Sequence, residues 1–153
     1  NSKIGHQNLS IIGFGDFYIE NSYIIGYAFV ALRGDYGSLW DGTITIKNCV
    51  WQPTSQRLTV IHASNHGEHD FGYTSKMPEN IYIDGLKILD EGYNEDIPVY
   101  VLPNYDANFR PGKPFAYVPT KKLVARNITT ACERAVLPFE KPEMYEGIDY
   151  TLE

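Results

Sequence analysis

Apolar residues recur at every second position along most of the chain, whereas the spacings of three and four that mark an amphipathic helix are scarce. Gly and Pro, with 13 and 9 copies, interrupt this pattern at short intervals. A period of two is the spacing of side chains on one face of a β-strand. The sequence therefore predicts an all-β fold built from short strands.

Four segments of the chain superpose on one template of eight positions. The first and third positions are apolar in every copy, and the fifth is Asn or Gly. Asn and Gly tolerate a left-handed backbone conformation, so the fifth position predicts a sharp bend between two short strands. The segments are 17–24, 44–51, 81–88 and 123–130, and their bend residues are Asn21, Asn48, Gly85 and Asn127.

The template also predicts which side chains face inward. Alternation along a strand places the first and third positions on the inner face, and the sixth position joins them after the bend. The fourth position faces outward and carries a charge whose sign alternates from copy to copy. Strands stack about 4.8 Å apart, so opposite charges are expected side by side. These outward charges are Glu20, Lys47, Asp84 and Arg126.

A second apolar stretch follows each copy of the template, which predicts a second strand in each repeat. These stretches span residues 28–33, 58–62, 99–102 and 135–137. The separation between bends grows along the chain and exceeds the about 20 to 25 residues of a bare coil, so the excess is predicted to leave the stack as loops on one side. Binding and catalysis generally reside on such loops, which here are 34–42, 63–80 and 103–122.

The coil motif at residues 44–51, Ile-x-Ile-x-Asn-Cys-x-Trp, recurs in looser form at irregular intervals. It resembles the right-handed parallel β-helix superfamily, which includes pectate lyases, polygalacturonases and phage tailspikes. The resemblance implies one domain of about four coils over residues 9–137 with an irregular tail at 138–153, or a fragment of a longer β-helix with further coils. It also implies an extracellular or cell-surface protein whose partner is a polysaccharide or oligosaccharide.

Charge and composition narrow the partners. The chain of 153 residues has a formal net charge of −6, which disfavours nucleic acid because that partner requires clustered Lys and Arg. No apolar run approaches the length of a bilayer span, so membrane insertion is not expected. The chain begins at Asn1 without a signal-peptide pattern, which indicates a segment of something longer. No residue pattern identifies a cofactor.

The chain has two cysteines, Cys49 and Cys132, and they lack the spacing of metal ligands. They fall in the second and fourth copies of the repeat. Two coil spacings separate such positions by about 10 Å, beyond the reach of a disulfide. Both thiols are therefore expected to be unbonded.

Three of the four histidines lie in one polar segment, residues 62–70, where a strand is predicted to end. Histidine serves as a general acid or base near neutral pH, or as a metal ligand, and His66 and His69 have the residue type for either role. The alternative is a polar loop whose histidines stack on the aromatic residues that follow. His62 lies two residues beyond Val60, so alternation places it inward, where a satisfied core histidine is the alternative to a catalytic one.

Parallel coils place the ends of successive strands in register, so polar residues just beyond these ends are predicted to converge on one edge. Together with the histidine segment they make up the residue types of a sugar site, in which Arg33 pairs with a uronate carboxylate. The alternative for Arg33 and Asp35 is a surface ion pair of little energy. The catalytic candidates are Arg33, Asp35, His62, His66 and Asp106.

Aromatic residues make up 14% of the chain, with 12 Tyr, and many of them lie in the predicted loops. The apolar face and the hydroxyl of Tyr suit sugar rings as well as protein interfaces. The alternative is that these rings anchor the loops to their own domain. The candidates for substrate binding in the groove are Tyr36, Trp40, Asn65, Tyr73, Asn104 and Tyr105.

Comparison with the family leaves two functions open. Polygalacturonase-like hydrolases carry Asn-Thr-Asp, an Asp-Asp pair and Gly-His-Gly, and only Asn65-His66-Gly67 resembles any of these. Glycosidases normally need two positioned carboxyl groups, and no acidic cluster of the pectate lyase type is found, although Arg33 could serve as the base. One hypothesis is a polysaccharide lyase or glycoside hydrolase, or a fragment of one. The other is a non-catalytic structural or binding segment of a cell-surface or tailspike protein.

Overall fold

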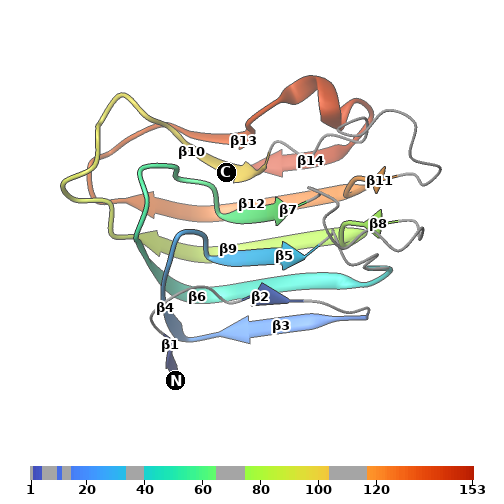
Figure 1. Cartoon of the computed structure of the whole chain (residues 1–153), viewed down its shortest axis with the longest axis horizontal. Helices are drawn as coiled ribbons and strands as arrows, with labels where there is room; N and C mark the ends of the chain where they lie inside the picture. The colour runs from blue at the N-terminus through green and yellow to red at the C-terminus, as the bar shows by residue number, and fades with distance from the viewer. Residues whose placement is uncertain (1, 5–9, 12–14, 34–39, 65–74, 104–116) are drawn as a thin grey trace.

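The computed structural model describes residues 2–4, 10–11, 15–33, 40–64, 75–103 and 117–153. Within these ranges the fold is all-β, with a single turn of 3-10 helix, η2 (Pro142–Tyr145), and every strand pair is parallel. Successive strands lie one above another from the N-terminus to the C-terminus (Figure 1). No helix in the described ranges is long and apolar enough to cross a membrane.

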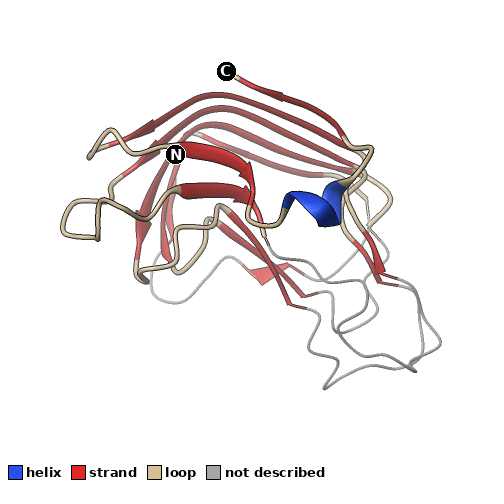
Figure 2. Cartoon of the chain, turned by 90° about the horizontal axis from the view of Figure 1, so that it is seen from above, coloured by secondary structure: helices blue, strands red, loops and turns tan. Residues whose placement is uncertain are grey.

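One large sheet holds seven strands in the order β1-β4-β6-β9-β12-β14, with β3 also paired to β6. Figure 2 shows these strands from above, where they bend and follow one another as a curved layer. The strands are β1 (Ser2–Ile4), β3 (Phe17–Glu20), β4 (Ser22–Gly26), β6 (Thr43–Pro53), β9 (Asn80–Ile88), β12 (Lys122–Thr130) and β14 (Asp149–Leu152).

Most of the strands that follow those of the large sheet along the chain form smaller parallel sheets. One has the order β2-β5-β7, and the other pairs β10 with β13, with a single bridge from Thr59 to Tyr100 linking the two. A short pair, β8 with β11, lies within the predicted loops and was not anticipated. The strands are β2 (Ser10–Ile11), β5 (Val30–Arg33), β7 (Ile61–Ser64), β8 (Ser75–Lys76), β10 (Val99–Leu102), β11 (Tyr117–Val118) and β13 (Val136–Phe139).

The predicted template is confirmed position by position. Phe17 pairs with Ile44, Ile44 with Ile81 and Ile81 with Leu123, so all four copies share one register. The backbone φ at the fifth position is positive in every copy, as a left-handed bend requires. These angles are 51° at Asn21, 47° at Asn48, 84° at Gly85 and 55° at Asn127.

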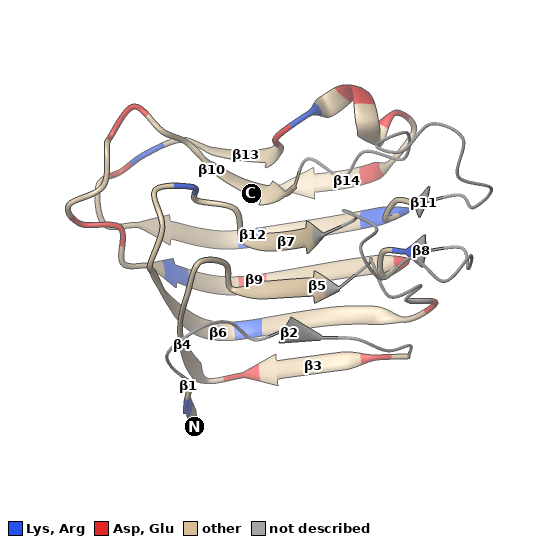
Figure 3. Cartoon of the chain, in the orientation of Figure 1, with Lys and Arg blue, Asp and Glu red and all other residues tan. Residues whose placement is uncertain are grey.

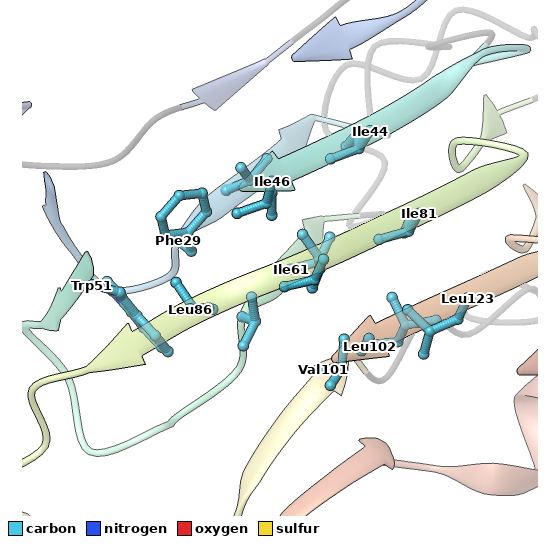
Figure 4. Packing of buried hydrophobic residues seen from close by; sticks show 14 of the residues in the cluster. Phe29, Ile44, Ile46, Trp51, Ile61, Ile81, Leu86, Val101, Leu102 and Leu123 are labelled. Carbon is cyan, nitrogen blue, oxygen red and sulfur yellow. The ribbon is translucent and has the colours of Figure 1, made fainter. Parts of the chain in front are cut away.

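The inward positions form the hydrophobic core. Ile44 and Ile81 are completely buried, and Leu123 continues the same row on the next strand. Figure 4 shows these side chains clustered with Ile61 of β7 and with Phe29, which directly precedes β5. A shift of the pairing by one residue would turn every one of these side chains to solvent, so burial of one face fixes the register.

The outward charges also stack as predicted. Glu20 pairs with Lys47, Lys47 with Asp84 and Asp84 with Arg126 along the ladder. The row continues by one more residue than the sequence indicated, because Arg126 Nε lies 2.9 Å from a carboxylate oxygen of Glu153. Figure 3 shows acidic and basic residues distributed over the strands of this sheet. The two signs therefore alternate along the stack.

The prediction of an irregular tail from residue 138 was wrong. Strand β13 extends to Phe139, and β14 pairs with β12 in the large sheet. The tail folds back because Tyr145, at the end of η2, is 3% exposed, stacks on Phe139 and donates a hydrogen bond of 2.7 Å to the carbonyl oxygen of Pro103. The segment was predicted to be irregular because it contains Pro138 and Pro142, and proline is typical of loops.

Other strand boundaries in the structure also differ from the predicted ones. Near the predicted start of the coils at residue 9, strand β2 pairs with β5. Strand β1 was missed, because three exposed residues carry no alternation. Strand β7 begins at Ile61 rather than at residue 58, since the chain bends at Val60.

Both cysteines are free, as predicted. Cys49 occupies the inward sixth position of the template, and its Sγ lies 3.1 Å from the carbonyl oxygen of Lys47. Burial raises the pKa of the Cys49 thiol above its ordinary value. Cys49 therefore acts as a small core residue, and its thiol stays protonated at neutral pH.

We expect the substitution Asn48→Ala to lower the free energy of unfolding by about 1 to 2 kcal/mol, because alanine is strained in the left-handed region that this bend requires. Urea denaturation followed by circular dichroism measures the change. The matched control is Asn48→Gly, which removes the same side chain and keeps the backbone conformation accessible. An alanine variant as stable as the glycine variant would contradict the role of the bend.

Candidate functional site

Most of the residues proposed from the sequence for catalysis and substrate binding lie outside the described ranges, and their roles stay predictions. For Arg33 the backbone is described, at the end of β5. His62 and Trp40 are described with their side chains. The residues outside the described ranges are Asp35, Tyr36, Asn65, His66, Tyr73, Asn104, Tyr105 and Asp106.

The ends of β5 and β7 lie in register, with Arg33 opposite Ser64. The amide of Val60, just before β7, donates a hydrogen bond of 2.8 Å to the carbonyl oxygen of Tyr100, so β10 runs beside the start of β7. The backbone exits of β5 and β7 are thus adjacent. Whether the side chains beyond these exits converge is a prediction that the described residues do not test.

His62 faces outward, not inward as alternation from Val60 predicted. Its neighbours Ile61 and Ala63 are buried, whereas His62 itself is half-buried, with its ring edge-on to that of Tyr27 at 5.1 Å between centroids. The prediction failed because Val60 and Ile61 are both completely buried, so the bend at Val60 shifts the alternation by one residue. His62 is therefore within reach of solvent on the outer side of β7.

Trp40 lies in the hydrophobic core. Its side chain is 3% exposed, and it belongs to the same buried cluster as Ile44 and Met77. Its Nε1 has no hydrogen-bond partner within the described part of the chain. A ring buried in this way anchors its own segment, which is the alternative considered for the aromatic residues, and offers no open face to a sugar.

A buried ion pair that was not predicted from the sequence links Asp90 to Arg134. Asp90 and Arg134 have side chains that are 0% and 1% exposed, and the Arg134 Nε donates to Asp90 Oδ2. The guanidinium also donates to the carbonyl oxygens of Asn94 at 2.6 Å and Ile97 at 2.7 Å. Each charge is therefore matched by hydrogen bonds from the two turns that follow β9 and β12.

The pKa directions agree with this geometry. Burial opposes ionisation of the Asp90 carboxyl, but the hydrogen bonds from Arg134 and from the amide of Ala131 outweigh it and hold its pKa below the ordinary value. The pKa of Arg134 is raised, because the Asp90 carboxylate outweighs the cost of burial. The pair is thus a structural link between two turns.

No group of three or more His, Cys, Asp or Glu in the described ranges could hold a metal ion.

The open face of the large sheet carries a different set of residues. At the second template position, Tyr18 pairs with Thr45, Thr45 with Tyr82 and Tyr82 with Val124, so these residues form one row across four strands. Tyr18 is 57% exposed and Tyr82 37% exposed. No role was predicted for this position from the sequence, although a tyrosine occupies it in two of the four copies.

A hollow of about 270 Å³ lies on this face. It lies between the row of Tyr18, Thr45, Tyr82 and Val124 and the row of outward charges. We call this hollow the face site. Its lining consists of Tyr18, Thr45, Ile46, Lys47, Tyr82, Ile83, Asp84, Val124 and Arg126.

Hydrogen bonds orient two side chains of the face site, Asp84 and Tyr18. The side-chain Nδ2 of Asn127 donates to Asp84 Oδ1 at 2.8 Å, and the Tyr18 hydroxyl donates to Glu20 Oε2 at 3.1 Å. Partial loss of hydration and the hydrogen bond to the Glu20 carboxylate raise the pKa of the Tyr18 hydroxyl. The phenol therefore stays neutral at physiological pH. The face site combines flat apolar rings with fixed donors and acceptors.

Comparison with known proteins adds no relative to this description. No family model matches the chain, and no curated protein or solved structure matches it. The face site and the arrangement of the strands are therefore the basis for inferring a function.

We expect Asp90→Asn to lower the free energy of unfolding at pH 7 by about 3 to 5 kcal/mol, because the buried guanidinium of Arg134 loses its counter-charge. Urea denaturation measures the change. Replacing both residues by apolar ones, Asp90→Leu with Arg134→Met, is expected to recover a large part of the loss. A single variant as stable as the wild type would contradict the structural role of the pair.

The pair also predicts a pH dependence. Because the pKa of Asp90 is lowered in the folded state, its stabilisation is complete above the unfolded pKa of about 3.9 and is lost as pH falls through the lower folded value. Stability measured from pH 6 to pH 2 should fall less steeply below about pH 4 in Asp90→Asn than in the wild type. The control is Asp96→Asn, which removes an exposed carboxyl and should leave the slope unchanged.

Proposed function

We propose that the chain is a segment of a right-handed parallel β-helix that binds an oligosaccharide on the open face of its large sheet. The observation that carries this proposal is the face site, where two exposed tyrosines, Tyr18 and Tyr82, border Lys47, Asp84 and Arg126. The protein is proposed to act at a cell surface or in the extracellular space.

The order of the strands supports the β-helix. The chain passes from β4 in the large sheet to β5 in a smaller sheet, and returns to the large sheet at β6. It repeats this passage through β7 to β9 and through β10 to β12. Parallel neighbours that are separated in sequence by a strand of another sheet are the arrangement that successive coils produce.

The chemistry of the face site supports a sugar ligand. Tyrosine rings pack against the C–H faces of sugars and leave the sugar hydroxyls accessible. Arg126 and Lys47 supply donors only, whereas the Asp84 carboxylate supplies acceptors. Along a strand, the tyrosine row and the charged row are two residues apart, which is roughly 6.6 Å. A pyranose ring between them would contact both rows.

The proposal is limited to binding. Asp84 is the carboxylate in the lining of the face site, and hydrolysis of a glycosidic bond normally needs two positioned carboxyl groups. Of the catalytic candidates, Arg33 and His62 lie on β5 and β7, which belong to a different sheet from the face site. A lyase or glycosidase activity based on Arg33 and His66 stays an alternative.

A purely structural role is the second candidate function. It is favoured by the unbroken parallel pairing from β3 through β6, β9 and β12 to β14, which makes a stiff rod. Such a segment would provide length to a cell-surface or tailspike protein. The two candidates differ in one measurable property, the affinity of the isolated chain for glycans.

We expect Tyr82→Ala to weaken glycan binding by about tenfold, or about 1.4 kcal/mol, because one stacking surface is lost. A glycan array identifies ligands of the wild type, and isothermal titration calorimetry then compares the variants. Tyr150→Ala is the matched control, since Tyr150 is 52% exposed on β14 but packs against Phe139, away from the face site. Absence of any ligand on the array would support the structural role instead.

A further inference from the structure

The charges beside the face site form an alternating row. Lys47 lies between Glu20 and Asp84 in the ladder, and Arg126 lies between Asp84 and Glu153. Each of these two cations therefore has a carboxylate beside it in both directions along the stack. Three carboxylates and two cations make up the row, so it offers no excess of positive charge to an anionic ligand.

An alternating row suits hydroxyl groups better than carboxylates. A sugar hydroxyl donates one hydrogen bond and accepts others, so it can bridge a carboxylate and a neighbouring cation. A uronate or sulfate group near Arg126 would also approach Asp84 and Glu153, and like charges placed together weaken binding. The charge pattern thus selects against acidic sugars.

The tyrosine row gives the direction of the ligand. Tyr18 and Tyr82 lie on β3 and β9, with β6 between them, so they are two strand spacings apart, about 9.6 Å. Thr45 and Val124 occupy the same row on the intervening and following strands and present smaller side chains. A ligand that follows this row runs across the strands, parallel to the direction in which they stack.

One strand spacing is close to the advance of one pyranose in an extended β-1,4-linked chain. In such a chain neighbouring residues are turned by about half a turn, so every second residue presents the same face. The alternation of large and small side chains in the tyrosine row has the same period, with a ring at Tyr18 and Tyr82 and a small side chain at Thr45 and Val124.

From these observations we infer that the face site binds a neutral, extended β-1,4-linked oligosaccharide laid across the strands, one sugar residue to each strand. This inference rests on the proposed function and goes beyond it by naming the charge and the linkage of the glycan. It excludes polygalacturonate, an acidic glycan of the kind that the predicted pairing of Arg33 with a uronate carboxylate favours.

Three hexasaccharides test the inference by isothermal titration calorimetry on the whole chain. Cellohexaose is neutral and extended, maltohexaose is neutral with α-1,4 linkages, and hexagalacturonate is acidic. We expect cellohexaose to bind about tenfold more tightly than either of the others. Equal or tighter binding of hexagalacturonate would overturn the charge selection, and equal or tighter binding of maltohexaose would overturn the linkage. Binding of none of a wider glycan array would instead refute the proposed function itself.

A variant that removes one negative charge gives a second, independent readout. Asp84→Asn keeps an oxygen that accepts from Asn127 but removes the negative charge between Lys47 and Arg126. Hexagalacturonate should then gain about tenfold in affinity relative to cellohexaose, and added salt should reverse the gain. Asp96→Asn, the same change on an exposed turn, should leave the ratio unaltered. An unchanged ratio in Asp84→Asn would contradict the charge selection.

Discussion

The left-handed bend at one position of the template is the constraint on which the rest of this structure depends. Three of the four bends are made by asparagine, at φ values that other side chains rarely adopt, and glycine makes the fourth. Each bend lies four residues after the first template position, so the four copies stack without a shift in register. At Gly85 the neighbouring coil is close, because an added Cβ would lie 3.0 Å from the side-chain Oδ1 of Asn48 and 3.4 Å from its backbone nitrogen.

A common register on the inner face also fixes the outer face. Once Ile44 and Ile81 pair in the core, Thr45 must pair with Tyr82 and Lys47 with Asp84 on the solvent side. The alternating charges and the spaced tyrosines are therefore set by burial of core residues on the opposite face. In this fold, packing decides the geometry of the candidate site, and the outward side chains supply only its chemistry.

The sequence was sufficient for features that repeat and insufficient for those that occur once. The template, its bends and its charge row follow from period-two alternation, which averages over four copies. His62 was misplaced because a single bend at Val60 shifts the alternation locally. The ion pair joins Asp90 and Arg134, which lie far apart in the sequence, so no local sequence pattern predicts it. Strand β14 was hidden for a related reason, since its partner determines it more than its own residues do.

The corners away from the bends are held by specific polar contacts. Trp51 Nε1 donates to the carbonyl oxygen of Gly26 at 2.9 Å, and the Tyr93 hydroxyl donates to that of Pro53 at 2.7 Å. The ion pair of Asp90 with Arg134 does the same between the last coils. These contacts join neighbouring coils at the C-terminal ends of the strands of the large sheet. A face held in this way would lose little conformational entropy on binding the proposed ligand, and few side chains could then suffice for affinity.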